Sequence, residues 1–254
     1  MILDAHQQAA VETTEKRVLV SSSPGAGKTR TICARYEYMV TKLHIPASQI
    51  AVITFTRYAA GELRNRIGPS IGSSFLGTFH AFALKIIEMY GDRRKWSPEY
   101  LTILDESETR LDEDEILHDL GVKTRKGTWS RITAGDWEKF KRQTSCGMSD
   151  GITGAVMEQC ESVWLAFRDR LRSQNTLTFD LILSEALALM DDPEIMAQLR
   201  ARWRHFLVDE AQDADARQYE LVERFMPETL MLVGDVDQTV YGWRGARPDL
   251  FLNF

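Results

Sequence analysis

Four short segments of the chain are apolar at consecutive positions rather than at alternating ones. They are residues 17–22 (RVLVSS), 50–56 (IAVITFT), 206–210 (FLVDE) and 230–235 (LMLVGD). Strands covered on both faces of a parallel sheet show this pattern. Segments with helical spacing follow the first and third runs, and Asp213 or Asp215 is placed to cap the later helix. The order strand, helix, strand predicts an α/β domain with a parallel sheet.

The middle of the chain follows a different period. Between about residues 80 and 203 the apolar positions recur at helical spacing, clearest in residues 79–90, 156–171 and 179–190, and no comparable strand pattern occurs. Loops are expected near Gly121–Gly127 and Cys146–Gly154. We therefore predict a sheet domain of residues 1–79 and 204–254, interrupted by an inserted all-helical subdomain of residues 80–203.

Charge is unevenly distributed along these segments. The formal net charge of the 254-residue chain is -6, which by itself disfavours a nucleic-acid-binding protein. Residues 105–119 carry eight carboxylates against one Arg, whereas residues 121–142 carry seven Lys or Arg against two acids. Two interpretations stay open: two solvated helix faces, or a local basic surface within an acidic chain.

Composition also bears on the compartment. No apolar run approaches the roughly 20 residues that a membrane-spanning helix needs. The N-terminal segment MILDAHQQAAVE lacks the features of a secretory signal. Three scattered cysteines suit neither a disulfide framework nor a zinc site. We expect a cytoplasmic protein with buried thiols and no membrane partner.

A glycine-rich segment, SSPGAGKT (22–29), lies between the first apolar run and the first helix. Small residues at Pro24, Gly25, Ala26 and Gly27 let backbone N–H groups curl around phosphates, and the helix N-terminus adds a positive dipole end. In a phosphate loop of this kind, Lys28 reaches the β and γ phosphates and the Thr29 hydroxyl coordinates Mg²⁺. Ser22 stands where the usual pattern has its first glycine. The segment predicts a nucleoside triphosphate site.

A second carboxylate site is expected on a neighbouring strand. Asp209 ends an apolar run, where it can hold Mg²⁺ through water, and Glu210 follows, where it can activate the attacking water. A strand-end Asp-Glu pair can also simply cap the following helix. Because Lys28 and Thr29 occur in the same chain, the catalytic interpretation of Asp209 and Glu210 is favoured.

Several motifs in order now resemble one family, the UvrD/Rep/PcrA group of superfamily-one DNA helicases. Residues 3–11 resemble the family's Gln motif, 22–30 motif one, 54–68 motif Ia and 77–83 a further DNA-contacting motif. Residues 177–183 resemble a late helical motif, 207–213 motif two and 232–246 motif three. The resemblance covers essentially the whole chain. It implies a RecA-like P-loop domain with a helical insertion, which agrees with the pattern above.

The resemblance also implies roles in the nucleotide site. Gln7 would hydrogen-bond the adenine edge, and Arg30 would lie near the base or sugar. Gln238 would sense the γ-phosphate, and Asp235 would support the metal and water site. ATP and Mg²⁺ are the implied cofactors. Gln7 could instead be an ordinary residue on a helix surface.

Residues that grip single-stranded DNA are implied in the same way. They would be Phe55, Arg57, His80, Tyr241, Trp243 and Arg244. Trp243 would stack on a base, at roughly 1–3 kcal/mol per base, and Arg244 would connect that contact to the nucleotide. Two alternatives stay open, since Phe55 could be a core residue and His80 a capping or packing residue. Where the family has Asn-Lys, this chain has Arg57 and Tyr58.

The implied function is that of the ATP-binding half of a 3′-to-5′ DNA helicase or single-strand translocase acting on single strands and duplex junctions. The family's motor has a second RecA-like domain, which supplies arginines worth on the order of 10³–10⁵ in rate. We expect that domain from the rest of the polypeptide or from a partner chain, and little or no unwinding by these residues alone. The alternative is a stand-alone nucleotide- or DNA-binding regulatory module or split-helicase subunit. A small-molecule kinase is disfavoured, because motifs two and three have no place in one.

Overall fold

A computed structural model of the chain describes residues 3–122, 132–146, 154–239 and 246–252. It divides into two compact units, Met1–Ala83 with Met190–Phe254, and Leu84–Leu189. The sequence placed these divisions at 79/80 and 203/204. The second one falls earlier because α9 (Pro193–Arg202) packs against the turn at Ala47–Gln49 and so belongs to the sheet unit.

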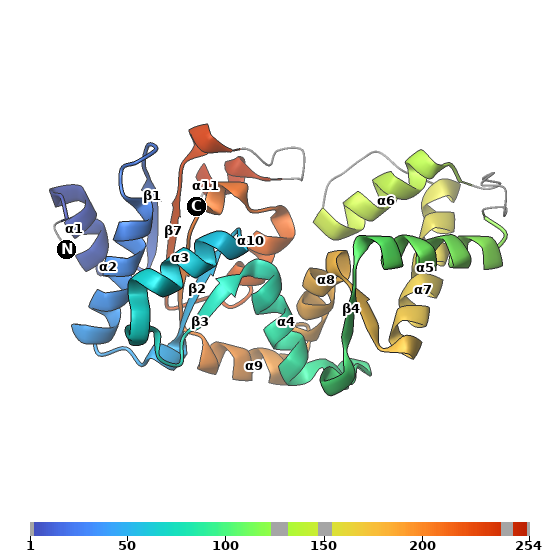
Figure 1. Cartoon of the computed structure of the whole chain (residues 1–254), viewed down its shortest axis with the longest axis horizontal. Coiled ribbons are helices and arrows are strands. Elements are labelled where there is room, and N and C mark those ends of the chain that lie inside the picture. The colour runs from blue at the N-terminus through green and yellow to red at the C-terminus, as the bar shows by residue number, and fades with distance from the viewer. Residues whose placement is uncertain (1–2, 123–131, 147–153, 240–245, 253–254) are drawn as a thin grey trace. The chain divides into compact units, whose positions relative to one another are not determined.

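The sheet unit contains five parallel strands in the order β1-β7-β6-β2-β3 (Figure 1). Their bounds are β1 (Arg17–Ser21), β2 (Ile50–Thr54), β3 (Phe75–Thr78), β6 (His205–Val208) and β7 (Thr229–Gly234). This confirms the predicted α/β class and all four predicted strands. The sequence missed β3, which has only four residues and lies at an edge.

The central strands are covered on both faces, as expected. Every residue of β2 is buried, because helices pack on each side of it. The edge strand β1 differs from the prediction, since alternate residues are exposed and Leu19 is 37% exposed. An edge strand has a neighbour on one side only, so its side chains are less completely covered.

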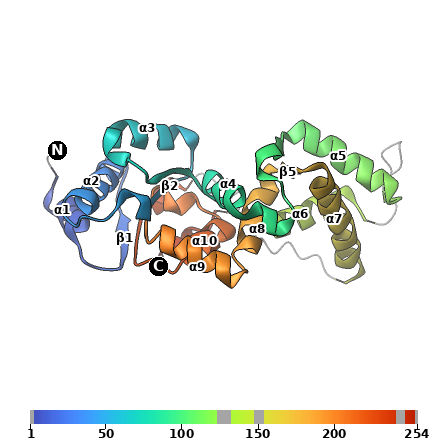
Figure 2. The ribbon, with the colours of Figure 1, turned by 90° about the horizontal axis from the view of Figure 1, so that it is seen from below.

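Different helices cover the two faces of the sheet. On one face, α2 (Lys28–Thr41) and α3 (Arg57–Ile67) pack Ile32, Tyr36 and Leu63 against Val52 and Met231. Figure 2 shows α9 and α10 (Ala216–Glu223) on the opposite side of β2 from α2 and α3.

That second face carries an aromatic cluster. The ring of Phe82, in α4 (Phe79–Tyr90), lies 4.8 Å from Trp203, 5.7 Å from Phe206 and 5.5 Å from Phe225 between centroids. Rings at these separations and tilts gain attraction beyond the burial of their apolar area. The cluster packs the start of α4 against this second face of the sheet.

Two short helices complete the sheet unit, α1 (Ala5–Glu12) and α11 (Pro248–Leu252). The cap predicted for α10 is Asp215, whose side chain accepts a 2.9 Å hydrogen bond from the backbone of Gln218. Asp213, the alternative, instead ends the turn Ala211–Asp213 that follows β6.

The second unit is mainly helical, as expected. Its helices are α5 (Glu106–Asp119), α6 (Ala134–Cys146), α7 (Ala155–Gln174) and α8 (Phe179–Leu189). The expectation of an all-helical subdomain was wrong in one respect, because β4 (Thr102–Leu104) and β5 (Thr176–Thr178) form a parallel pair. Three residues per strand are too few to leave a readable pattern. The core includes Trp137 stacked on Phe140 at 5.8 Å and the buried Cys160.

Charges on α5 and α6 are partly paired with each other. The largely buried Glu113 of α5 accepts a hydrogen bond from Lys141 of α6 at 2.8 Å. Lys141 therefore serves packing inside this unit. Four other basic residues of the segment, Lys123, Arg125, Lys126 and Arg131, lie outside the described residues.

The thiols and the helix lengths fit the expectations as far as they are described. Cys33 and Cys160 are buried, and burial raises the pKa of each thiol to about 11, so both stay protonated at neutral pH. Among the described helices, none is long and apolar enough to cross a membrane.

The buried carboxylate of Glu185 holds several segments of the helical unit together. Glu185 is 1% exposed and accepts hydrogen bonds from Arg94 at 3.2 Å, Trp96 at 3.2 Å and Arg172 at 3.3 Å, and another from Arg168. Burial by itself would raise the pKa of Glu185, but the positive charges of Arg168 and Arg94 outweigh it and hold the pKa below its ordinary value. The carboxylate joins α8, α7 and the segment before β4.

Replacing Glu185 by Gln is expected to lower the free energy of unfolding by about 3 kcal/mol, because the arginines around it lose their counter-charge. The folded pKa is depressed, so the carboxylate stabilises the fold above the pKa of an unfolded Glu and loses this effect as the pH falls through the lower folded value. The difference from wild type should therefore shrink on acidification. Urea unfolding at a series of pH values measures it.

The matched control is Glu106→Gln on exposed α5, where the pair with Arg110 is solvated. This change is expected to cost less than about 0.5 kcal/mol. Equal effects of the two substitutions, or a Glu185 effect independent of pH, would contradict the role given to the buried carboxylate.

Candidate functional site

The glycine-rich loop joins β1 to α2 at the carboxyl edge of the sheet. Gly25 and Gly27 have φ of 76° and 87°, a left-handed backbone that favours glycine. The backbone N–H of Ala26 closes a turn onto the Ser23 carbonyl at 3.2 Å. Ser22 donates its N–H to the Gly234 carbonyl at 3.2 Å and so continues the pairing of β1 with β7. Its backbone is not left-handed, so the position does not need the glycine of the usual pattern.

The first turn of α2 is open to an anion. Its N-cap is Gly27, which makes no side-chain capping bond, and the turn contains no acidic residue. By contrast, Asp4 caps α1 and Thr56 caps α3 through side-chain oxygens. Uncapped N–H groups at a helix N-terminus suit phosphate oxygens. Pro24 and Arg30, on either side of this point, are exposed, and Thr29 is half-buried.

Lys28, the first residue of α2, connects the loop to the end of β7. Its Nζ lies 3.7 Å from Asp235 Oδ2, and the two side chains are only 9% and 5% exposed. Asp235 also accepts hydrogen bonds from the Gln238 side chain and from the backbone of Asp237 at 3.1 Å. The structure thus brings the proposed phosphate-binding lysine and the proposed γ-phosphate sensor to one carboxylate.

Asp209 and Glu210 lie at the carboxyl end of β6. Asp209 is 2% exposed, and its backbone donates to Ile53 at 2.8 Å. Burial, reinforced by the negative charge of Glu210, raises the pKa of Asp209 to about 7, although Lys28 opposes the shift. Such a carboxyl gains from a cation placed next to it.

The backbone of Glu210 is left-handed, with φ 51° and ψ 42°. A non-glycine residue in this region costs free energy and persists only where its surroundings impose it. Glu210 precedes the turn Ala211–Asp213, and its side chain makes no capping hydrogen bond to that turn. The cap of α10 is Asp215, six residues later than Asp209.

Gln212 is a buried residue that the sequence did not single out. Its Nε2 donates to Glu210 Oε2 at 2.9 Å, and its Oε1 accepts from the Asp235 backbone at 3.0 Å. A Cβ at Gly234 would lie 2.4 Å from Gln212 Oε1, so only glycine permits this approach. The signal available in the sequence was an amide two residues after Glu210. Gln212 joins the ends of β6 and β7.

Gln7 lies against the phosphate loop. It belongs to α1, and its Nε2 donates to the Ala26 carbonyl at 2.7 Å. Its Oε1 accepts from the backbone of Asp4 at 3.1 Å as part of a capping box. A Cβ at Gly27 would lie 2.8 Å from Gln7 Nε2. Gln7 therefore packs on the loop rather than lying apart on a helix surface.

Three of the residues expected to contact DNA lie at the same edge, beyond β2 and β3. Phe55 is half-buried after β2, and Arg57 is exposed in the first turn of α3, next to Tyr58. His80 is half-buried in the first turn of α4, and burial lowers its pKa to about 4. At neutral pH His80 is uncharged, so it can offer a hydrogen bond to DNA but no positive charge.

The other three, Tyr241, Trp243 and Arg244, lie outside the described residues. The chain on either side of them is held to the sheet unit. Asp235 caps the turn Val236–Gln238 before them. After them, Ala246 forms an antiparallel bridge with Asp215, and the Arg247 backbone donates to Ala214 at 2.9 Å.

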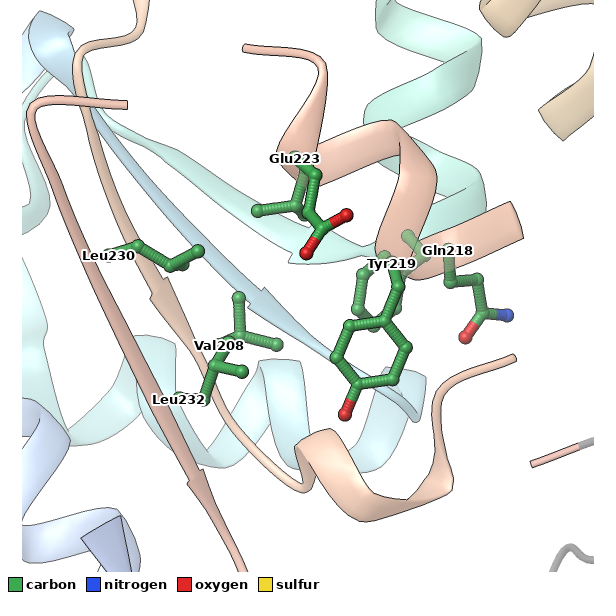
Figure 3. Close-up of a pocket in the computed structure, with 8 residues that line it drawn as sticks. Val208, Gln218, Tyr219, Glu223, Leu230 and Leu232 are labelled. Carbon is green, nitrogen blue, oxygen red and sulfur yellow. The ribbon is translucent and has the colours of Figure 1, made fainter. Parts of the chain in front are cut away.

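A small apolar pocket lies on the face of the sheet that α10 covers. It is separate from the carboxyl edge of the sheet, where Lys28 and Asp235 lie. Figure 3 shows it between α10 and the strands, lined by Val208, Tyr219, Leu230 and Leu232 among others. The Tyr219 hydroxyl donates to the Ala211 carbonyl at 2.7 Å, which braces the turn after Glu210. An apolar lining of this kind does not suit a phosphate.

Comparison with known proteins agrees with the family resemblance of the sequence motifs. Residues 3–254 match the family model of the UvrD/REP helicase N-terminal domain. The chain is 30% identical to an ATP-dependent DNA helicase PcrA of Leuconostoc citreum, over 98% of this chain and 34% of that protein. It is 29% identical to a probable DNA helicase II homolog of Mycoplasma capricolum, over 100% of this chain and 37% of that protein.

A PcrA of Staphylococcus aureus is 27% identical over 99% of this chain and 36% of its own length. The chain thus spans about a third of the length of these curated relatives, at their N-terminal part. The resemblance inferred from the motifs is confirmed, and the chain belongs to the UvrD/REP helicase N-terminal domain family.

Proposed function

We propose that these residues are the ATP-binding part of a 3′-to-5′ DNA helicase or single-strand DNA translocase. The observation that carries the proposal is the meeting of Lys28, Asp209, Glu210 and Gln238 at one sheet edge, beside the uncapped start of α2. Ligands of open α/β sheets bind at this edge. The polarity comes from the resemblance to the family.

The loop and Lys28 would hold the triphosphate. Uncapped backbone N–H groups at the start of α2 would bind the phosphates, and the ammonium of Lys28 would exchange Asp235 for the β and γ phosphates. Gln238, already hydrogen-bonded to Asp235, would then lie close to the γ-phosphate. The same carboxylate therefore links the phosphate-binding lysine to its sensor.

Mg²⁺ fits the oxygen donors at this edge. Among the described residues, no group of three or more His, Cys, Asp or Glu side chains forms a metal site alone. Mg²⁺ bound with a nucleotide needs only one or two protein oxygens, completed by phosphates and water, and Thr29 and Asp209 would supply them. When bound, the ion would neutralise charge developing on the transferred phosphoryl group. It would also satisfy the buried carboxyl of Asp209.

Glu210 would take the proton of the attacking water. The hydrogen bond from Gln212 and the left-handed backbone fix the direction of the Glu210 carboxylate before substrate arrives. A base that is already oriented avoids reorganisation during the reaction. An arginine from a second RecA-like domain would complete the site, so we expect these residues alone to bind ATP weakly and hydrolyse it slowly.

The DNA strand would cross the same edge on the side of β2 and β3. Arg57 offers a charge to a phosphate, and Phe55 and the neutral His80 offer stacking and a hydrogen bond. Tyr241, Trp243 and Arg244 follow the γ-phosphate sensor in sequence, which supports a role in coupling the strand to the nucleotide.

Substitutions at Lys28 and Glu210 separate binding from hydrolysis. Lys28→Ala is expected to abolish measurable ATP–Mg²⁺ binding without unfolding the chain, because the phosphates lose their main cation. Glu210→Gln should keep ATP affinity within about twofold of wild type while lowering turnover at least about a hundredfold, measured with a second RecA-like domain added and with single-stranded DNA present. ATP binding by the Lys28 variant equal to that of wild type would refute the site.

The DNA-binding side is tested by two arginines at opposite ends of α3. Arg57→Gln should weaken single-strand binding with little sequence bias and lower the slope of log affinity against log salt by about 1. Arg66→Gln removes the same charge at the C-terminal end of the helix, where Arg66 pairs with Glu62, and should change neither quantity. Equal losses in both variants would mean that the helix attracts DNA only through its net charge.

A further inference from the structure

Helix α1, which carries Gln7, is poorly anchored by apolar contacts. It has eight residues, and an isolated helix of that length is unstable in water. Val11 is its one buried residue. The capping box of Asp4 and Gln7 stabilises the N-terminal end but does not attach the helix to the sheet unit. Polar contacts with the loop and with α2 therefore add to its attachment.

Arg35 supplies such contacts at the C-terminal end of α1. This residue lies two turns into α2 and is 3% exposed. Its Nη1 donates to the carbonyls of Val11 at 2.6 Å and Thr13 at 2.8 Å. Carbonyls at the end of a helix have no partner within the helix and carry the negative end of its dipole. A buried guanidinium is a strong donor for them.

The two ends of α1 are thus tied to one structural unit, the phosphate loop and the helix that follows it. Gln7 binds the Ala26 carbonyl of the loop, and Arg35 extends from α2 to the other end. Helix α2 starts at Lys28, so α1 is attached to the same helix whose first turn would bind the phosphates.

We propose that Arg35 is a positioning residue for base recognition: by holding α1, it sets Gln7 against the purine of a nucleoside triphosphate whose phosphates lie in the loop. This inference rests on the proposed function. Arg35 touches neither base nor phosphate in it. It follows that Arg35 contributes to the affinity for the base and not to the affinity for the triphosphate.

The experiment compares ATP with inorganic tripolyphosphate, both with Mg²⁺, on the 254-residue chain. Arg35→Met keeps the length of the side chain and removes its donors. It should weaken ATP binding about fivefold or more, as expected for loss of charge-assisted hydrogen bonds, and leave tripolyphosphate binding unchanged. Arg35→Lys, which can still donate to a carbonyl, should recover part of the ATP affinity.

Arg200→Met is the matched control. Arg200 also donates to a backbone carbonyl after a helix, that of Arg224 at 2.7 Å, but it lies in α9. Its loss should alter neither ligand. Hydrogen exchange gives a readout without nucleotide: Arg35→Met should speed exchange of the α1 amides and leave those of β2 and β6 unchanged.

The outcomes separate this inference from the function on which it rests. Equal weakening of ATP and tripolyphosphate by Arg35→Met, or unchanged ATP binding, would overturn the role of Arg35 while leaving the phosphate site intact. Equal affinity of the wild-type chain for both ligands would also overturn it, because no base contact would exist to position. Failure of Lys28→Ala to weaken tripolyphosphate would instead refute the phosphate site.

Discussion

The contact between Lys28 and Asp235 is the constraint on which the rest of the site depends. It joins the first turn of α2 to the end of β7, and both side chains are nearly buried. Removing an ammonium and a carboxylate from water is costly, and their mutual attraction offsets that cost only while they stay paired. A triphosphate offers the lysine a stronger partner, and Asp235 keeps the hydrogen bond from Gln238 when the lysine leaves it. In the proposed function, nucleotide binding would therefore be coupled to the turn Val236–Gln238, which precedes Tyr241 and Trp243 in sequence.

A polar network fixes the geometry around that contact. Gln212 connects Glu210 to the Asp235 backbone, Gly234 leaves room for it, and the backbone of Glu210 is left-handed. Buried polar groups are costly when unpaired and rigid when every partner is present. The parallel sheet provides the rigidity, since β6 and β7 are neighbours and end at the same edge. The strained backbone of Glu210 and the buried carboxyl of Asp209 lie where the chemistry is proposed to occur.

Much of this could be predicted from local sequence. Strands β2, β6 and β7 are buried on both faces and so have continuous apolar runs, and the loop at 22–29 carries its glycines where the backbone is left-handed. The pattern failed for β4 and β5, because three residues give too little periodicity, and for the edge strand β3, because its first and last residues are only half-buried. Gln212 and Arg35 were missed because their partners lie more than 20 residues away, at separations of 23 and 24. A polar residue within a helix or turn is otherwise expected at the surface.

The most direct test of a nucleotide site at this edge is a map of backbone amide chemical shifts on addition of a non-hydrolysable ATP analogue with Mg²⁺. The largest changes should fall in residues 22–30, near Asp209 and Gln212, and near Asp235 and Gln238. The amides around Tyr219 and Leu230, beside the apolar pocket, should change little. Changes centred on that pocket, with none in the glycine-rich loop, would contradict the account.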